Sequence, residues 1–123
     1  MATMDLLGAP LALTEAKDVP RIRREICRRA AAVLPHLGKI DDIELLASEA
    51  VTNAVLHGTG IIDVAVICGP DRFRVEVRDQ GPANPGSDRR DYGRGLTIIN
   101  ALASRWSLQA DEYGTCLWFE VDL

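Results

Sequence analysis

The chain has 123 residues, 47% of them hydrophobic, and a formal net charge of −4. This length is enough for one two-layer core, so a single domain over residues 1–123 is expected. The acidic balance argues against general nucleic-acid binding, because a basic excess is needed to neutralise phosphates. No apolar run reaches the roughly 18 residues that a membrane-spanning helix needs.

Three cysteines, Cys27, Cys68 and Cys116, are widely separated and have no histidine at metal-ligand spacing. They indicate small core residues of a reduced protein. The start of the chain lacks the charged and apolar segments of a signal peptide, so the protein is expected to be cytoplasmic.

The first third of the chain predicts an edge strand followed by a basic helix. Residues 11–13 form a short apolar run. A helix is expected over about residues 19–34, with Asp18 as its N-cap and Pro20 in its first turn. Its outer surface is predicted to carry Arg21, Arg23, Arg24, Arg28 and Arg29. Such a surface is either a solvated cationic face or a docking site for an acidic partner.

A second helix, central to the chain, is predicted from Asp41, its expected N-cap, to Gly58, which is expected to end it in the left-handed conformation. Glu49, Asn53 and His57 are spaced i, i+4, i+8 and form a polar stripe beside the apolar face. A solvated stripe is one interpretation. A functional stripe is the other, because asparagine is unfavourable inside a helix and this glutamate stands alone among apolar residues.

Two strands, residues 61–67 and 72–79, are expected to pair as an antiparallel hairpin. Apolar and charged side chains alternate along the second strand, and the alternation places Asp79 on the inward, apolar face. A carboxylate in that position needs a hydrogen-bond donor. Asp79 therefore either caps the turn that follows it or binds a ligand.

A polar loop over residues 82–92 is followed by a predicted helix, residues 93–103, whose glycine-rich start leaves N–H groups free for phosphate. Two more strands are expected over residues 106–110 and 115–121. The order of elements predicts an α/β (α+β) two-layer sandwich: a mixed, mostly antiparallel sheet with helices packed on one face.

Four short motifs carry a resemblance to a known family. Ser48-Glu-Ala-Val-Thr-Asn-Ala-Val-Leu-His-Gly58 resembles the N-box of the GHKL ATP-binding superfamily, in the form found in bacterial anti-sigma factors that are also serine protein kinases. Asp79-Gln-Gly81, Gly93-Arg-Gly95 and Gly114-Thr115 resemble its three glycine boxes, in the family's order. The resemblance implies a histidine kinase-like ATP-binding domain with the Bergerat fold.

The resemblance also implies roles for individual residues. Asn53 would ligate Mg²⁺ through its side-chain oxygen, and Glu49 would be the general base. Asp79 would accept a hydrogen bond from the adenine amino group, with Gly81 allowing close approach of the backbone and Thr115 supporting the carboxylate. Further contacts to ATP are expected from the lid, residues 82–92, and the helix behind it: Arg89, Arg90, Gly93, Arg94, Gly95 and Leu96.

The implied function is that of an anti-sigma factor and serine/threonine protein kinase, with ATP and Mg²⁺ as cofactors. It would sequester a sigma factor and phosphorylate an anti-sigma factor antagonist, regulating transcription by partner switching without direct contact to nucleic acid or membrane. The resemblance further implies partner contact by an arginine near the start of the first helix, where Arg21 lies nearest, and a possible homodimer.

The alternative is a docking module that holds ATP without catalysis, or has lost it. A lid of only 11 residues, and Ala83 near the place of the second glycine of the first glycine box, favour this alternative. The intact pair of Glu49 and Asn53 favours the kinase. The catalytic half of a histidine kinase is disfavoured, because no helical hairpin with a phosphoacceptor histidine precedes the domain.

Overall fold

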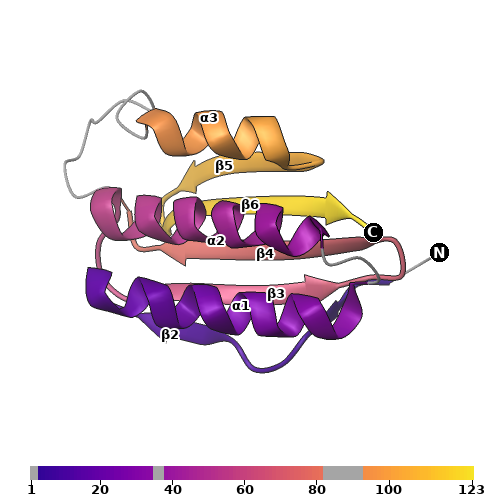
Figure 1. The fold of residues 1–123 in the computed structure, drawn as a ribbon. Helices are drawn as coiled ribbons and strands as arrows, with labels where there is room; N and C mark the ends of the chain where they lie inside the picture. The colour runs from indigo at the N-terminus through magenta and orange to yellow at the C-terminus, as the bar shows by residue number, and fades with distance from the viewer. Residues whose placement is uncertain (1–2, 35–37, 82–92) are drawn as a thin grey trace.

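The computed structural model describes residues 3–34, 38–81 and 93–123. Its elements, in chain order, are β1 (Asp5–Leu6), β2 (Leu11–Leu13), the 3-10 helix η1 (Ala16–Asp18), α1 (Val19–Val33), α2 (Gly38–His57), β3 (Ile62–Cys68), β4 (Arg72–Asp79), α3 (Gly93–Leu102), β5 (Arg105–Asp111) and β6 (Gly114–Asp122). Helices α1, α2 and α3 lie over one face of the sheet (Figure 1). The predicted two-layer sandwich is confirmed.

The sheet has the strand order β1-β3-β4-β6-β5, and β2 also pairs with β3. Each pairing between these strands is antiparallel. The register of β4 and β6 places Asp79 directly opposite Thr115. Directly opposite residues of an antiparallel pair share a face, so these two side chains lie together on the face that the helices cover.

The alternation along β4 is confirmed. Phe73, Val75 and Val77 are at most 1% exposed and pack beneath the helices. Helix α2 lies between α1 and α3 (Figure 1), and its apolar residues Ile43 and Leu46 are fully buried. The hydrophobic core therefore fills the space between the helix layer and one face of the sheet, while the other face carries charged side chains.

Helix α2 begins earlier than predicted. It starts at Gly38 rather than at Asp41, which lies inside its first turn. Two contacts extend it: Ile40 packs against the core, and the Nζ of Lys39 donates a hydrogen bond to the carbonyl oxygen of Asp122. The N-cap prediction for Asp41 is wrong because these tertiary contacts favour the longer helix.

The caps predicted for two other helix ends also differ from the structure. Asp18 stands at the N-cap position of α1, but its side chain makes no capping hydrogen bond. The described glycines with positive φ are Gly8, Gly60, Gly81 and Gly114, so Gly58 does not end α2 in the left-handed conformation.

The N-terminal edge consists of two short strands rather than one, joined through Gly8, whose φ is 85°. Arg29, predicted on the outer surface of α1, is instead only 9% exposed. Its Nη1 donates hydrogen bonds to the carbonyl oxygens of Leu7, at 3.0 Å, and Ala9, at 2.8 Å. These backbone acceptors draw the arginine inward and hold the N-terminal segment on α1.

Candidate functional site

The C-terminal half of α2 carries the predicted polar stripe. Asn53 is only 5% exposed, and its Nδ2 has no hydrogen-bond partner in the described part of the chain. Leaving a buried amide unpaired costs about 1–3 kcal/mol, so this N–H donor calls for an acceptor, such as an oxygen of water or of a ligand. Glu49 lies one turn earlier on the same side of the helix and is half-buried.

Asp79 ends β4 as a buried carboxyl, only 4% exposed. Its Oδ1 accepts a hydrogen bond from the backbone N–H of Gly81 at 2.8 Å, and Thr115 donates to it through backbone and side chain. Burial raises the pKa of Asp79 above its ordinary value, and the bonds from Gly81 and Thr115 only partly oppose this. Asp79 therefore caps its own turn and still presents a carboxyl on the apolar face.

Three glycines surround this carboxyl. A Cβ on Gly58 would lie 2.5 Å from the Cγ of Asp79, and one on Gly114 would lie 2.1 Å from its backbone oxygen. Gly81 has a φ of 118°, and a Cβ there would meet no described atom within 4 Å. Among the described residues, close packing against Asp79 therefore requires glycine at positions 58 and 114, whereas Gly81 is required by its backbone conformation.

Thr59 was not predicted to belong to this site. Its backbone oxygen accepts a hydrogen bond from the N–H of Gln80 at 3.1 Å, and its hydroxyl donates to the carbonyl of Gly81 at 3.3 Å. These bonds tie the segment after α2 to the turn after β4. Thr59 lies in a loop without periodicity, so only its place after the His57-Gly58 pair could have signalled it.

The other predicted residues are distributed as follows. Thr115 is 4% exposed beside Asp79. Leu96 is half-buried against the core, and Gly93, Arg94 and Gly95 form the first turn of α3. The predicted lid over residues 82–92, with Arg89 and Arg90, lies outside the described residues, as does the side chain of Arg94. The structure thus brings together Asp79, Thr115 and the last turn of α2. Glu49 and Asn53 lie on the same helix, one to two turns before that last turn.

The donor set fits a hard cation held together with phosphates. Asn53 offers an uncharged amide, and Glu49 offers one carboxylate a turn away. In the described residues, no group of three His, Cys, Asp or Glu side chains could hold a metal ion on its own. Mg²⁺ usually takes few ligands from protein and the others from phosphates and water, so a sparse oxygen site suits Mg²⁺ with a nucleotide.

Known proteins share part of this sequence. The anti-sigma F factor of Clostridium acetobutylicum is 32% identical over 75 residues, which are 58% of this chain and 51% of the relative. That of Geobacillus kaustophilus is 36% identical over 56 residues, 42% of this chain and 38% of the relative. The chain thus spans about half the length, or less, of these curated relatives. The similarity noted between the sequence motifs and anti-sigma factors is confirmed.

The fold is shared more widely than the sequence. A crystal structure of the RsbU and RsbW domains of a Mycobacterium tuberculosis protein matches with a TM-score of 0.66 and 23% identity, covering 93% of this chain and 32% of that chain. A family model described as "Histidine kinase-like ATPase domain" matches residues 12–121. This chain therefore belongs to the histidine kinase-like ATPase domain family.

Proposed function

We propose that the protein binds ATP with Mg²⁺ and transfers a phosphoryl group to a serine or threonine of an anti-sigma factor antagonist, acting as an anti-sigma factor by partner switching. The observation that carries the nucleotide site is the unpaired Nδ2 of the buried Asn53 on α2, an N–H donor that a phosphate or water oxygen would satisfy. The last turn of the same helix contacts the buried carboxyl of Asp79. The similarity to anti-sigma F factors supports the regulatory part.

In this mechanism the side-chain oxygen of Asn53 would hold Mg²⁺, and Glu49 would accept the proton of the attacking hydroxyl. The carboxylate of Asp79 would accept a hydrogen bond from the adenine amino group. Bound Mg²⁺ would neutralise charge on the phosphates. Backbone N–H groups at the start of α3 would bind the phosphates, together with the side chains of Arg89, Arg90 and Arg94.

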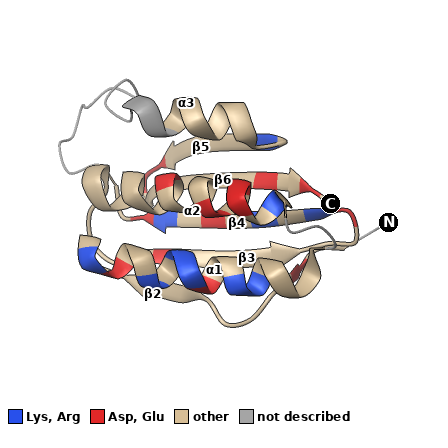
Figure 2. Cartoon of the chain, viewed as in Figure 1, with Lys and Arg blue, Asp and Glu red and all other residues tan. Residues whose placement is uncertain are grey.

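The partner surface is assigned to α1. Arg21, Arg24 and Arg28 are exposed along this helix, which carries much of the positive charge seen in Figure 2. The start of α1 lies at the same end of the molecule as the end of α2 (Figure 1). An acidic partner docked on Arg21 would therefore lie near the helix end that carries the proposed catalytic residues.

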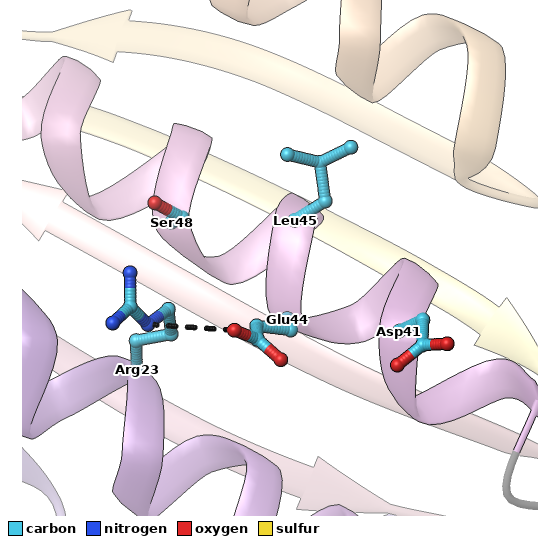
Figure 3. A pocket seen from close by; sticks show the side chains of 5 residues that line it. All are labelled: Arg23, Asp41, Glu44, Leu45 and Ser48. Carbon is cyan, nitrogen blue, oxygen red and sulfur yellow. Dashed lines mark ion pairs between the residues drawn. The ribbon is translucent and has the colours of Figure 1, made fainter.

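A groove between α1 and α2 adjoins this surface. Figure 3 shows its lining, in which Arg23 of α1 faces Glu44 of α2 across 3.9 Å. The cavity measures about 270 Å³ and is also lined by Asp41, Leu45 and Ser48. Leu45 is 42% exposed and its side chain points away from Arg23 (Figure 3), so a partner docked here would meet an exposed apolar side chain on α2 as well as the arginines of α1.

The proposal extends to the setting of the protein. Residues 1–123 would form one ATP-binding domain that works in the cytoplasm, with a homodimer as its possible assembly. Among the described helices, none has the length and apolar character to cross a membrane. The proposed partners are proteins, and contact with DNA is left to the sigma factor.

Calorimetry with ATP, with and without Mg²⁺, tests the nucleotide site. We expect micromolar binding that depends on Mg²⁺, and at least about a tenfold loss of affinity in Asn53→Ala. Glu49→Ala should bind ATP normally but fail to transfer phosphate to a serine-bearing antagonist. Leu56→Ala, at a 64% exposed position of the same helix, is the matched control. Normal Mg²⁺-dependent binding by Asn53→Ala would show that the metal role is wrong.

A second candidate function is docking without catalysis. It is favoured by the lid of 11 residues and by Ala83, near the place of a glycine in the first glycine box. In that case wild-type protein should bind a partner but transfer no phosphate to a serine-bearing antagonist, whether or not it binds ATP. The transfer assay therefore separates the two functions, and calorimetry shows whether a docking module has kept or lost ATP.

A further inference from the structure

Gly58 follows the last residue of α2, and its backbone does not explain why it is a glycine. The φ of Gly58 is not positive, so an L-residue could adopt the same backbone conformation. The neighbours explain it instead. A Cβ on Gly58 would lie 2.5 Å from the Cγ of Asp79, 2.6 Å from its Cβ and 2.7 Å from the backbone oxygen of Ala54.

Other glycines differ from Gly58 in what a Cβ would meet. At Gly114 it would meet the backbone of Asp79, and the φ of 142° strains any side chain there. At Gly60 it would meet the flexible end of Gln80. At Gly38 it would meet no described atom within 4 Å. Gly58 is distinguished because the obstructed group is a buried carboxyl of the proposed site.

The carboxyl of Asp79 has little freedom to move aside. It is 4% exposed and its Oδ1 is bonded to the N–H of Gly81 at 2.8 Å. The turn that holds it is bonded to Thr59 through Gln80 and Gly81, at 3.1 and 3.3 Å. A methyl group at position 58 must therefore turn the carboxyl away or push the end of α2 from β4.

We infer that Gly58 is a positioning residue: it lets the carboxyl of Asp79 rest against the end of α2 and so sets the preference of the site for the nucleotide base. This role rests on the proposed function, in which Asp79 accepts a hydrogen bond from the adenine amino group. Guanine carries a carbonyl oxygen at that position, which a carboxylate repels, so a correctly placed Asp79 discriminates ATP from GTP.

The first test compares Gly58→Ala with Gly38→Ala by calorimetry, using ATP, GTP and inorganic tripolyphosphate, each with Mg²⁺. Gly58→Ala should lose about tenfold in ATP affinity and a similar factor in the preference for ATP over GTP. Its affinity for tripolyphosphate, which has no base, should stay within about twofold of wild type. Gly38→Ala, at the other end of the same helix, should keep all three affinities.

The second test needs no nucleotide and uses melting temperatures. Asp79→Gly removes both side-chain atoms that a Cβ at position 58 would meet. Gly58→Ala should therefore lower the melting temperature more in the wild-type background than in the Asp79→Gly background. The contact with the backbone oxygen of Ala54, at 2.7 Å, is present in both backgrounds and cancels in this comparison. Where Gly58→Ala alone is poorly folded, a larger folded fraction in the double variant gives the same answer.

Two results would overturn the inference about Gly58 alone. They are an unchanged preference for ATP over GTP in Gly58→Ala, or an equal loss of melting temperature in both backgrounds. A wild-type protein that does not bind ATP would instead contradict the proposed function, and one that binds ATP and GTP equally well would contradict the base-binding role of Asp79.

Discussion

Asp79 shows how the burial of a single carboxyl can lower stability near neutral pH. Burial raises the pKa of its carboxyl above the ordinary 3.8 despite hydrogen bonds from Gly81 and Thr115. A carboxyl with a raised folded-state pKa binds more protons when folded. Its contribution to stability is therefore largest at low pH and falls as the pH rises from the unfolded value through the folded pKa.

The variant Asp79→Asn tests this. It keeps an oxygen for the N–H of Gly81 and removes the buried charge, but its NH2 group cannot accept from Thr115. Compared with wild type at the same pH, the variant should therefore gain most in free energy of unfolding near neutral pH. The gain should shrink as the pH is lowered, because the wild-type carboxyl then becomes protonated as well. Denaturant unfolding over a pH series measures both effects. A gain that does not change with pH would contradict the raised pKa.

At the scale of elements, the sheet face opposite the helices is stabilised by a cluster of charges. Glu120 on β6 is only 4% exposed and accepts hydrogen bonds from Arg105 at 2.8 Å, Arg74 at 3.0 Å and Arg72 at 3.3 Å. The guanidinium of Arg74 also stacks on Trp118, 4.0 Å from the ring centroid. These contacts join β4, β5 and β6 on the face that no described helix covers.

Removing the charge of Glu120 should destabilise the sheet. Burial would raise the pKa of Glu120, but hydrogen bonds from Arg105 and Arg74 outweigh it and leave the pKa below the ordinary 4.5. The ionised Glu120 therefore contributes its whole stabilisation at pH values above 4.5, and this contribution is lost as the pH falls through the lower pKa of the folded state. Glu120→Gln should cost about 2 kcal/mol near neutral pH, because the arginines are partly solvated, and less in acid.

Denaturant unfolding checks this, with Glu76→Gln as the matched control. Glu76 is on the same face, but its side chain is 35% exposed and, within the described part of the chain, is paired only with Arg74, so its loss should cost less than about 1 kcal/mol. An equal loss of unfolding free energy in the two variants would show that three arginines around one glutamate stabilise the sheet no more than a single ion pair does.

Helices and strands could be predicted from sequence wherever apolar residues repeat with the period of a helix or a strand. The alternation along β4 placed Asp79 inward, and helical spacing placed Asn53 beside the apolar face. The errors arose where a distant contact decides the outcome. Lys39 reaches Asp122 and lengthens α2, and backbone acceptors draw Arg29 inward. The sequence predicts a backbone role for Gly58, because spacing along the chain does not reveal its contact with Asp79.

For the molecule as a whole, the proposed nucleotide site joins elements that are far apart in sequence. The end of α2, the end of β4, the start of β6 and the start of α3 would all contact one ligand, whereas β2 and most of α1 would not. A ligand that binds only the folded state stabilises it by about 2.7 kcal/mol at a concentration 100 times its dissociation constant. Amides that exchange through local opening gain protection only near the ligand.

Hydrogen exchange with and without MgATP therefore tests the location of the site. Protection should rise for residues 49–58, 79–81 and 93–96, while locally opening amides of β2 and the exposed side of α1 should exchange as before. MgGTP at the same concentration is the control, since Asp79 should disfavour guanine. Protection centred on α1 and β2 would place the nucleotide elsewhere, and the unpaired amide of Asn53 would then need a different ligand.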